Sequence, residues 1–384
     1  MDLNKLVFDI FRFSYFLIYV ALHLFLYLGL LMERRREKRT IAGPEKANPS
    51  VSLIIPVHNE GRRIGPLLKS LEAQDYLPLE IIFVDDRSQD ESTEMIAAFI
   101  RRVDHGRARI ITLTENPGPN YKQYALSQGI AASSGDFFLL TDADCEVPPS
   151  WVRGMVRRMS DPASGAAMGP VLKTSKEKGF FYLYQCYEHG LRYLYLAGAV
   201  GLGAAGGGFG NNLIIRRACL DTLGGYDQVP PSPTEDAALI SLIRSKTDYK
   251  VRAALGEDVQ VLTQGEQRWK DFMNQTLRWN NGGIFSPDRM TRFNYTFLML
   301  SSFLGVLGLL LLPFIPSLWP LPLGLQTGMT LSTVFCLVYF GSSLPRRRFG
   351  PAYVLSLLFT PPYFSLMTFM GLLGYKPRWK GKEV

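Results

Sequence analysis

The strongly apolar residues of the chain are concentrated in long runs at its two ends. From Phe13 to Met32 there is no Asp, Glu, Lys or Arg, and a helix needs about 20 such residues to cross a bilayer. From Phe293 to Tyr375 the only charged residues are Arg346–Arg348. The pattern predicts transmembrane helices at both ends of a more polar central segment.

The first apolar run is expected to be an anchor. It is followed by the basic cluster "ERRREKR" at Glu33–Arg39. A cleaved signal peptide is the alternative, but its apolar stretch has only about 7–15 residues and its charges come first. Under the positive-inside rule the basic cluster stays in the cytoplasm. We therefore expect an anchor with a basic juxtamembrane segment at 1–40 and a cytoplasmic domain at 41–292, at a plasma or inner membrane.

The C-terminal region, 293–384, is expected to hold two to three spans and a basic tail. Spans at about 295–315 and 323–344 flank the turn "PFIPSLWP" and return the chain to the cytoplasm at Arg346–Arg348. Pro361 and Pro362 would break a helix in the last apolar run. A re-entrant or interfacial segment and a true span are therefore both open, and so is the topology of the tail.

The central segment alternates between short apolar runs and stretches with helical periodicity. We expect strands at 51–57, 79–86, 109–113 and 136–144, and helices at 62–74, 88–102 and 120–133. Ser88, with Glu91 three residues on, is expected to cap the second helix. This alternation is typical of an α/β fold with a mostly parallel sheet and helices on both faces. Ligands bind such sheets beyond the carboxyl ends of the strands.

Polar residues follow three of these strands. They are Pro56–Glu60 after the first, Asp85 and Asp86 after the second, and Asp142 and Asp144 at the end of the run 136–144. In a strand, Asp142 and Asp144 would project to the same side and repel each other unless a cation lies between them. Mg²⁺ or Mn²⁺ suits such carboxylates. Capping of the next helix is the alternative for Asp86.

Several motifs then resemble a known family in both content and order. They are "SLIIPVHNE", "VDDRSQDES", "NYKQYALSQGIAASSGD", "TDADCEVPPSW", "TEDAAL" and "QTLRW", between residues 50 and 285. Together they resemble the family 2 glycosyltransferases, in the membrane branch with TED and QxxRW motifs that includes cellulose, chitin and hyaluronan synthases and ceramide glucosyltransferases. The resemblance implies a GT-A, Rossmann-like fold and an inverting, metal-dependent hexosyltransferase.

The resemblance also implies roles for the residues near the strand ends. Donor-binding residues would be Pro56, His58, Glu60, Asp85, Asp86, Lys122 and Asp142. Asp144 would bind the divalent ion, Mg²⁺ or Mn²⁺, that bridges the donor diphosphate. A solvated helix lysine is the alternative for Lys122.

The residues that the resemblance assigns to catalysis and acceptor binding lie in the second half of the matched segment. Asp236 in "TED" would be the catalytic base, although Thr234, Glu235 and Asp236 could instead only cap the helix that follows. Glu235, Gln275, Arg278 and Trp279 would contact the acceptor or the diphosphate. Gln275, Arg278 and Trp279 share one helix face by their spacing, and a packed Trp279 with an exposed Arg278 is the alternative.

Four further features bear on this assignment. Glycines at 206–212 occupy the place of an acceptor-facing motif in the branch, or form a flexible loop. The aromatic stretch 180–196 is compatible with a buried helix or with a membrane-interface helix. Arg87 and Gly265 depart from the family, which often has glycine and proline there.

Composition limits which acceptors and partners are expected. The net charge of +8 comes largely from clusters beside the apolar runs, which favours attraction to anionic lipid over nucleic acid. The four cysteines are scattered and are expected to be reduced thiols. Three or four spans are few for a polymer channel, so a UDP-sugar donor and a lipid or membrane-associated acceptor are expected. A polysaccharide synthase and a non-catalytic scaffold are the alternatives, and the oligomeric state is left open.

Overall fold

The computed structural model describes residues 3–43, 48–103, 106–174, 179–340, 346–379 and 382–383. The chain forms two compact units. We call the segments Met32–Thr174 and Gly203–Gln264 the sheet unit. We call the segments Met1–Leu31, Ser175–Leu202 and Gly265–Val384 the helical unit.

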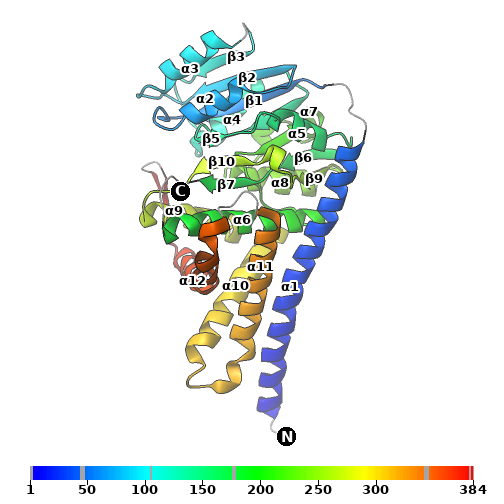
Figure 1. Ribbon diagram of the computed structural model, residues 1–384, viewed down its shortest axis with the longest axis vertical. Coiled ribbons are helices and arrows are strands. Elements are labelled where there is room, and N and C mark those ends of the chain that lie inside the picture. Colours follow the sequence, from blue (N-terminus) through cyan, green and yellow to red (C-terminus); the bar gives the residue numbers. More distant parts are fainter. Residues whose placement is uncertain are drawn as a thin grey trace. The chain divides into compact units, whose positions relative to one another are not determined.

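A seven-stranded mixed sheet forms the centre of the sheet unit (Figure 1). Its order is β3-β2-β1-β4-β8-β6-β9. Strands β1 to β4 run parallel to one another, β8 is antiparallel to β4 and β6, and β6 is parallel to β9. The bounds are β1 Val51–Val57, β2 Leu79–Asp85, β3 Ala108–Thr112, β4 Phe137–Leu140, β6 Ser164–Met168, β8 Leu213–Arg216 and β9 Lys250–Ala253.

Helices follow most of the strands, and the first three of them, α2 to α4, lie within the helical stretches predicted from the hydrophobic pattern. These helices are α2 Gly65–Glu72, α3 Ser92–Arg102, α4 Tyr121–Ala131, α5 Trp151–Arg158, α7 Arg217–Thr222 and α8 Glu235–Lys246. Consecutive residues of β1 and β2 are buried, so both faces of the parallel part of the sheet are covered. The predicted α/β class is therefore confirmed.

A smaller sheet and two short 3₁₀ helices complete this unit. The order of the sheet is β5-β10-β7, with β5 Cys145–Glu146, β7 Val171–Thr174 and β10 Val261–Gln264. The 3₁₀ helices are Tyr226–Gln228 and Glu257–Val259. Strand β5 directly follows the Asp142–Asp144 segment, so the small sheet anchors one end of that segment.

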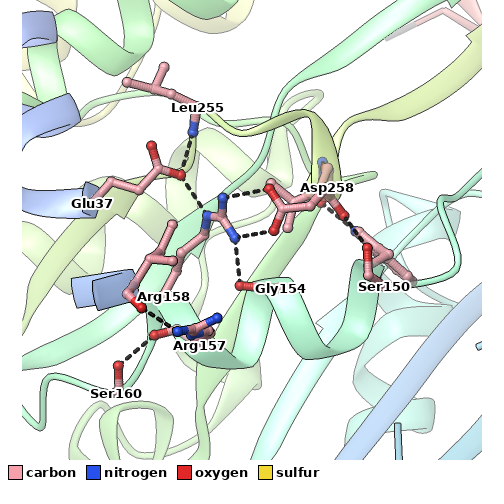
Figure 2. A network of polar contacts seen from close by, with 12 residues as sticks. Glu37, Ser150, Gly154, Arg157, Arg158, Ser160, Leu255 and Asp258 are labelled. Atoms are coloured by element: carbon pink, nitrogen blue, oxygen red, sulfur yellow. Dashed lines mark hydrogen bonds and ion pairs between the residues drawn. The ribbon is translucent and has the colours of Figure 1, made fainter. Parts of the chain in front are cut away.

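The last eleven residues of α1, which runs Leu3–Ala42, belong to the sheet unit and are bonded to it (Figure 2). Oε1 of Glu37 accepts from Nε of Arg158 at 2.6 Å and from the N–H of Leu255 at 2.8 Å. Arg158 also forms a double hydrogen bond to Asp258, at 2.8 and 2.9 Å. Glu33 accepts from the N–H of Ala253 at 3.1 Å, which satisfies a donor of the edge strand β9.

The helical unit consists mainly of helices. They are most of α1, α6 Phe180–Gly201, α9 Trp269–Ile284, α10 Arg289–Leu311, α11 Pro320–Phe340 and α12 Arg346–Leu372, with a 3₁₀ turn at Pro316–Leu318 and a small hairpin of β11 Arg378–Trp379 and β12 Lys382–Glu383. By length and composition, four described segments could cross a membrane: Leu3–Ala42, Arg289–Leu311, Pro316–Phe340 and Val354–Leu372. The end of the predicted span 323–344 falls at 341–345, outside the described residues.

The expected helix break at Pro361 and Pro362 is wrong, because α12 is continuous through both prolines. The aromatic packing around them explains why. The ring of Phe359 lies 4.8 Å from that of Tyr184 on α6, and Tyr363 stacks at 5.6 Å on Phe272 of α9. Tertiary contacts of this kind outweigh the local preference of proline.

Helix α6 is a buried element of the helical unit. Most of its residues are buried, and its tyrosines bond to α11: the hydroxyl of Tyr187 lies 2.7 Å from Oγ1 of Thr333, and that of Tyr195 lies 2.8 Å from Oγ of Ser332. A Cβ on Gly198 would lie 2.4 Å from the carbonyl oxygen of Leu26, so only glycine allows α1 and α6 to approach so closely. The buried-helix alternative is therefore the correct one.

Candidate functional site

The segment after β1 is tied to the segment after β2. Pro56 lies in β1, one residue before its end. Nδ1–H of His58 donates to the carbonyl of Asp86 at 2.6 Å. Asn59 has a left-handed backbone, with φ 54°, and its N–H donates to Oγ of Ser88 at 2.9 Å. The two strand ends thus form one connected edge.

The predicted cap of α3 is not formed. The helix begins at Ser92, with Glu91 as its N-cap residue and no side-chain capping bond. The hydroxyl of Ser88 accepts from Asn59 instead, and Oδ1 of Asp90 accepts from the N–H of Ser92 at 3.1 Å. Tertiary bonding to the first strand end therefore overrides the local capping box.

Asp85 and Asp86 are buried and bonded. Oδ1 of Asp85 accepts from the N–H of Ser88 at 3.3 Å. The carboxylate of Asp86 accepts from Nε of Arg87 and from Nδ2 of Asn116, each at 2.8 Å. The side chain of Asp86 is therefore held by these two partners rather than by the N-terminus of α3.

Arg87 occupies a backbone conformation that favours glycine. Its φ is 59°, in the left-handed region, and glycine is the residue that the family often has at this place. The side chain offsets part of this strain, because it pairs with Asp86 and its guanidinium carbon lies 5.3 Å from the ring centre of Tyr121. The departure from the family pattern therefore preserves the turn.

Asp142 and Asp144 lie in a turn, which corrects the strand predicted for 136–144. Strand β4 ends at Leu140, and β5 begins at Cys145. The turn is closed by the N–H of Cys145, which donates to the carbonyl of Asp142 at 3.2 Å. Strand alternation therefore does not set the direction of the two carboxylates. Their side chains are 32% and 21% exposed, so both are open to a ligand.

Lys122 joins the Asp142–Asp144 turn to the start of α8. It lies at the start of α4, which Asn120 caps by accepting from the N–H of Gln123 at 3.2 Å. Its Nζ lies 2.6 Å from Oδ1 of Asp142 and 3.3 Å from Oε1 of Glu235. Lys122 is therefore not a solvated helix lysine.

The charge of Lys122 is maintained by its acidic neighbours. Burial lowers the pKa of Lys122, but the negative charges of Asp142, Glu235 and Asp236 outweigh burial and raise the pKa above its ordinary value. Lys122 is therefore a permanent cation between the two acidic segments.

Asp236 is held at the first turn of α8 by backbone donors. Its carboxylate accepts from the N–H of Gly210 at 2.7 Å and from its neighbour Ala237 at 2.8 Å. Burial, followed by the charge of Glu235, raises the pKa of Asp236 to about 6, although Lys122 opposes the shift. A carboxylate poised in this way is suited to accept a proton near neutral pH.

The glycines at 206–212 form part of this arrangement. A Cβ on Gly210 would lie 3.1 Å from Cβ of Asp236, and a Cβ on Gly208 would lie 2.3 Å from Cδ1 of Ile240. Glycine therefore allows the loop to pack closely against α8, and a side chain at either position would require Asp236 or the end of Ile240 to shift. Thr234 is the N-cap residue of α8, but its side chain makes no capping bond.

Asp144 is flanked by both acidic and basic side chains. Burial, followed by the charge of Asp142, raises its pKa to about 6, with a smaller contribution from Glu60, while Arg63 and Lys122 act in the opposite direction. Nη1 of Arg63 lies 3.3 Å from Oδ2 of Asp144, and Nη2 lies 2.7 Å from Oε2 of Glu60. The sequence pattern does not reveal the role of Arg63, because Arg63 and Asp144 are 81 residues apart and no local pattern connects them.

These carboxylates fit a divalent cation that is shared with a ligand. Within the described ranges, no three His, Cys, Asp or Glu side chains are arranged to hold a metal by themselves. Mg²⁺ and Mn²⁺ sites for nucleotides commonly use only one or two carboxylates, with phosphates completing the shell. Asp142 and Asp144 are both accessible, and two such carboxylates meet that requirement.

The structure connects the predicted residues of the sheet unit through the start of α4. Nδ2 of Asn116 donates both to Asp86 and, at 3.0 Å, to the carbonyl of Tyr121. The next residue, Lys122, contacts Asp142 and Glu235. A single chain of contacts therefore runs from the second strand end to the first turn of α8.

The remaining predicted residues, Gln275, Arg278 and Trp279, lie on α9 in the helical unit. Nε2 of Gln275 donates to Oε1 of Glu266 at 2.9 Å. The ring of Trp279 lies 5.4 Å from that of His189, and the guanidinium of Arg192 lies 5.0 Å from the Trp279 ring centre. Trp279 is therefore packed against α6.

Comparison with known proteins identifies the family. Residues 52–224 match Glycosyl transferase family 2. An N-acetylglucosaminyltransferase of Bradyrhizobium elkanii is 35% identical over 132 residues, which cover 34% of this chain and 70% of the relative. The chain belongs to glycosyl transferase family 2.

One further relative and one solved structure are also similar to this family 2 chain. Probable glycosyltransferase YdaM of Bacillus subtilis is 30% identical over 255 residues, or 62% of this chain, and the match spans 56% of that relative's length. The solved mannosyltransferase PcManGT of Pyrobaculum calidifontis, in complex with GDP-Man and Mn²⁺, has a TM-score of 0.53 at 18% identity and covers 94% of this chain and 100% of its own. The structural likeness supports the GT-A fold.

Proposed function

We propose that this family 2 chain transfers a sugar from a UDP-sugar to a hydroxyl of a membrane-embedded lipid, with inversion at the anomeric carbon. The observation that carries the proposal is the position of Lys122, whose Nζ lies within 3.3 Å of both Asp142 and Glu235, beside Asp236. The arrangement joins a donor-binding turn to a base. The TED and QxxRW motifs favour the membrane branch of the family.

The donor would lie along the strand ends of the sheet unit. Pro56, His58, Glu60, Asp85 and Asp86 are proposed to line the uridine pocket. Asp142 and Asp144 would hold Mg²⁺ or Mn²⁺ with the diphosphate, where the ion would neutralise charge on the departing UDP. The Pyrobaculum mannosyltransferase, which shares this fold, was solved with GDP-Man and Mn²⁺, and this supports the proposal of a divalent ion.

Asp236 would act as the catalytic base. The acceptor hydroxyl oxygen attacks the anomeric carbon, the bond from that carbon to the diphosphate oxygen breaks, and the hydroxyl proton moves to Asp236. The backbone bonds from Gly210 and Ala237 orient the carboxylate, and a pKa of about 6 leaves it ionised near neutral pH. Lys122 would neutralise part of the charge that the donor brings.

The candidate membrane helices are the basis for proposing a lipid acceptor. Four candidate spans favour a lipid over a water-soluble acceptor. Glu235, Gln275, Arg278 and Trp279 are proposed to contact the acceptor or the diphosphate. The proposed organisation keeps an anchor at 1–40, a cytoplasmic catalytic domain at 41–292 and a membrane region at 293–384. UDP-glucose and UDP-N-acetylglucosamine are the donors to test first, the latter because several relatives are named N-acetylglucosaminyltransferases.

The proposal is tested by incubating the purified chain with radiolabelled UDP-sugars and a native lipid extract, followed by phase partition. We expect label in the organic phase, dependent on a divalent ion. Asp236→Asn should reduce transfer at least about 100-fold while leaving UDP affinity largely intact. The exposed Asp221 provides a matched control as Asp221→Asn, and this variant should transfer normally.

Two outcomes would replace the proposal. Label in an insoluble polymer that glycosidases digest would indicate a polysaccharide synthase. No transfer and no UDP release with any donor would indicate a non-catalytic scaffold.

A further inference from the structure

Arg63 bridges two acidic residues of the sheet unit. It forms ion pairs with Glu60 at 2.7 Å and with Asp144 at 3.3 Å. The Glu60 side chain is 8% exposed, whereas those of Asp144 and Arg63 are 21% and 41% exposed. The guanidinium therefore contacts the carboxylate proposed to hold the divalent ion, and it remains accessible to a ligand from solvent.

The turn that carries Arg63 is fixed by hydrogen bonds. The N–H of Glu60 donates to Oγ of Ser92 at 2.8 Å, and the N–H of Gly61 donates to Oδ2 of Asp90 at 2.9 Å. The N–H of Arg63 itself donates to the carbonyl of Glu60 at 2.8 Å. The guanidinium thus reaches Asp144 from a firmly held backbone.

A guanidinium and a divalent ion compete for the same carboxylate oxygen. At 3.3 Å, the contact of Arg63 with Asp144 is long for a charge-assisted bond. A diphosphate offers a planar guanidinium two oxygens at once, which is a stronger pairing. A nucleoside diphosphate that enters this site would therefore draw Arg63 from Asp144 and free Oδ2 for the ion.

We propose that Arg63 couples divalent-ion binding to donor binding, by occupying Asp144 until a nucleoside diphosphate takes over its guanidinium. The inference rests on the proposed function, because it requires Asp144 to be a metal ligand and the donor to carry a diphosphate. Arg63 is then a positioning residue for Asp144. By linkage, UDP tightens the binding of the ion by the same factor as the ion tightens the binding of UDP.

The test is Mn²⁺ binding to the purified full chain, followed by the electron paramagnetic resonance signal of free Mn²⁺, with and without UDP. For the unmodified chain we expect UDP to tighten Mn²⁺ binding about tenfold. Arg63→Gln should bind Mn²⁺ alone about tenfold more tightly than the unmodified chain, and UDP should tighten its Mn²⁺ binding by a smaller factor than in the unmodified chain, because only the direct contact of the diphosphate with the ion is left. Arg63→Met should behave in the same way, and Arg63→Lys, which keeps the charge, should recover part of the coupling.

The neighbouring Arg62 is exposed and gives a matched control. Arg62→Gln removes the same charge and should bind Mn²⁺ like the unmodified chain. If Arg63→Gln and Arg62→Gln behave alike with and without UDP, the coupling role is overturned and the proposed function stands. If the unmodified chain binds no Mn²⁺ with either UDP or GDP, both the coupling role and the proposed metal site are overturned.

Discussion

Among single residues, the acidic side chains of the site differ because their partners differ. Asp86 is compensated by Arg87 and Asn116. Asp144 and Asp236 are less compensated, and burial, followed by a neighbouring acid, raises the pKa of each to about 6. Perturbed carboxylates of this kind are typical of functional sites.

The pH dependence of transfer should follow the protonation of Asp236. A base with a raised pKa is protonated, and inactive, below that pKa, so kcat/KM should rise with pH through about 6 and then level off. Glu235→Gln removes a negative neighbour of Asp236, lowers the pKa of Asp236, and should therefore move this acidic limb of the kcat/KM profile to lower pH. The measurement is kcat/KM against pH at saturating Mn²⁺, because the ion competes with protons at Asp144 and removes its contribution. A limb that does not move in Glu235→Gln would contradict the role of Asp236.

At the scale of elements, the sequence predicts regular segments better than their ends. The run 51–57 is a strand, and the strand predicted for 79–86 ends one residue earlier, at Asp85. Both are almost entirely buried, because most of their residues on both faces are apolar. In the run 136–144 the strand ends at Leu140, because the turn that follows is fixed by contacts with distant residues. Likewise, the continuity of α12 through Pro361 depends on packing against α6 and α9.

In the candidate site, too, the sequence does not predict the features that depend on contacts between distant residues. The motifs place the acids, since each acid follows a strand or begins a helix. They do not reveal Arg63 or the bond from Gly210 to Asp236, because both join residues far apart in the chain. Contacts of this kind depend on how the elements pack.

The end of α1 should contribute strongly to the stability of the sheet unit. Arg158 is buried between Glu37 and Asp258 (Figure 2), so Arg158→Met leaves Glu37 buried without its cation. We expect a loss of about 3–5 kcal/mol in the free energy of unfolding. On the same helix, Arg153 is 36% exposed and pairs with Asp75, and Arg153→Met should cost at most about 1 kcal/mol. Thermal or denaturant unfolding in detergent compares the two variants, and equal losses would contradict this view.

For the whole molecule, charge and hydropathy together predict the sidedness. The proposed topology places the sheet unit in the cytoplasm and the turn between α10 and α11 outside. All four native cysteines are buried, so introduced cysteines can be labelled selectively. Lys69→Cys in α2 and Phe314→Cys in the turn are both at exposed positions.

A membrane-impermeant maleimide, applied to intact spheroplasts, checks this topology. It should label Phe314→Cys and should reach Lys69→Cys only after the membrane is permeabilised. Labelling of Lys69→Cys in intact spheroplasts would reverse the assigned orientation.

The central claim is that acids from separate stretches of the chain form one site for a metal ion and a nucleotide. The most direct measurement is an experimental structure of the full chain with UDP and Mn²⁺, with the metal located by its anomalous scattering. We predict Mn²⁺ at Asp144, with the diphosphate between Asp142 and Arg63 and the uracil near Asp86. Mn²⁺ and UDP bound away from Asp142 and Asp144 would contradict the account.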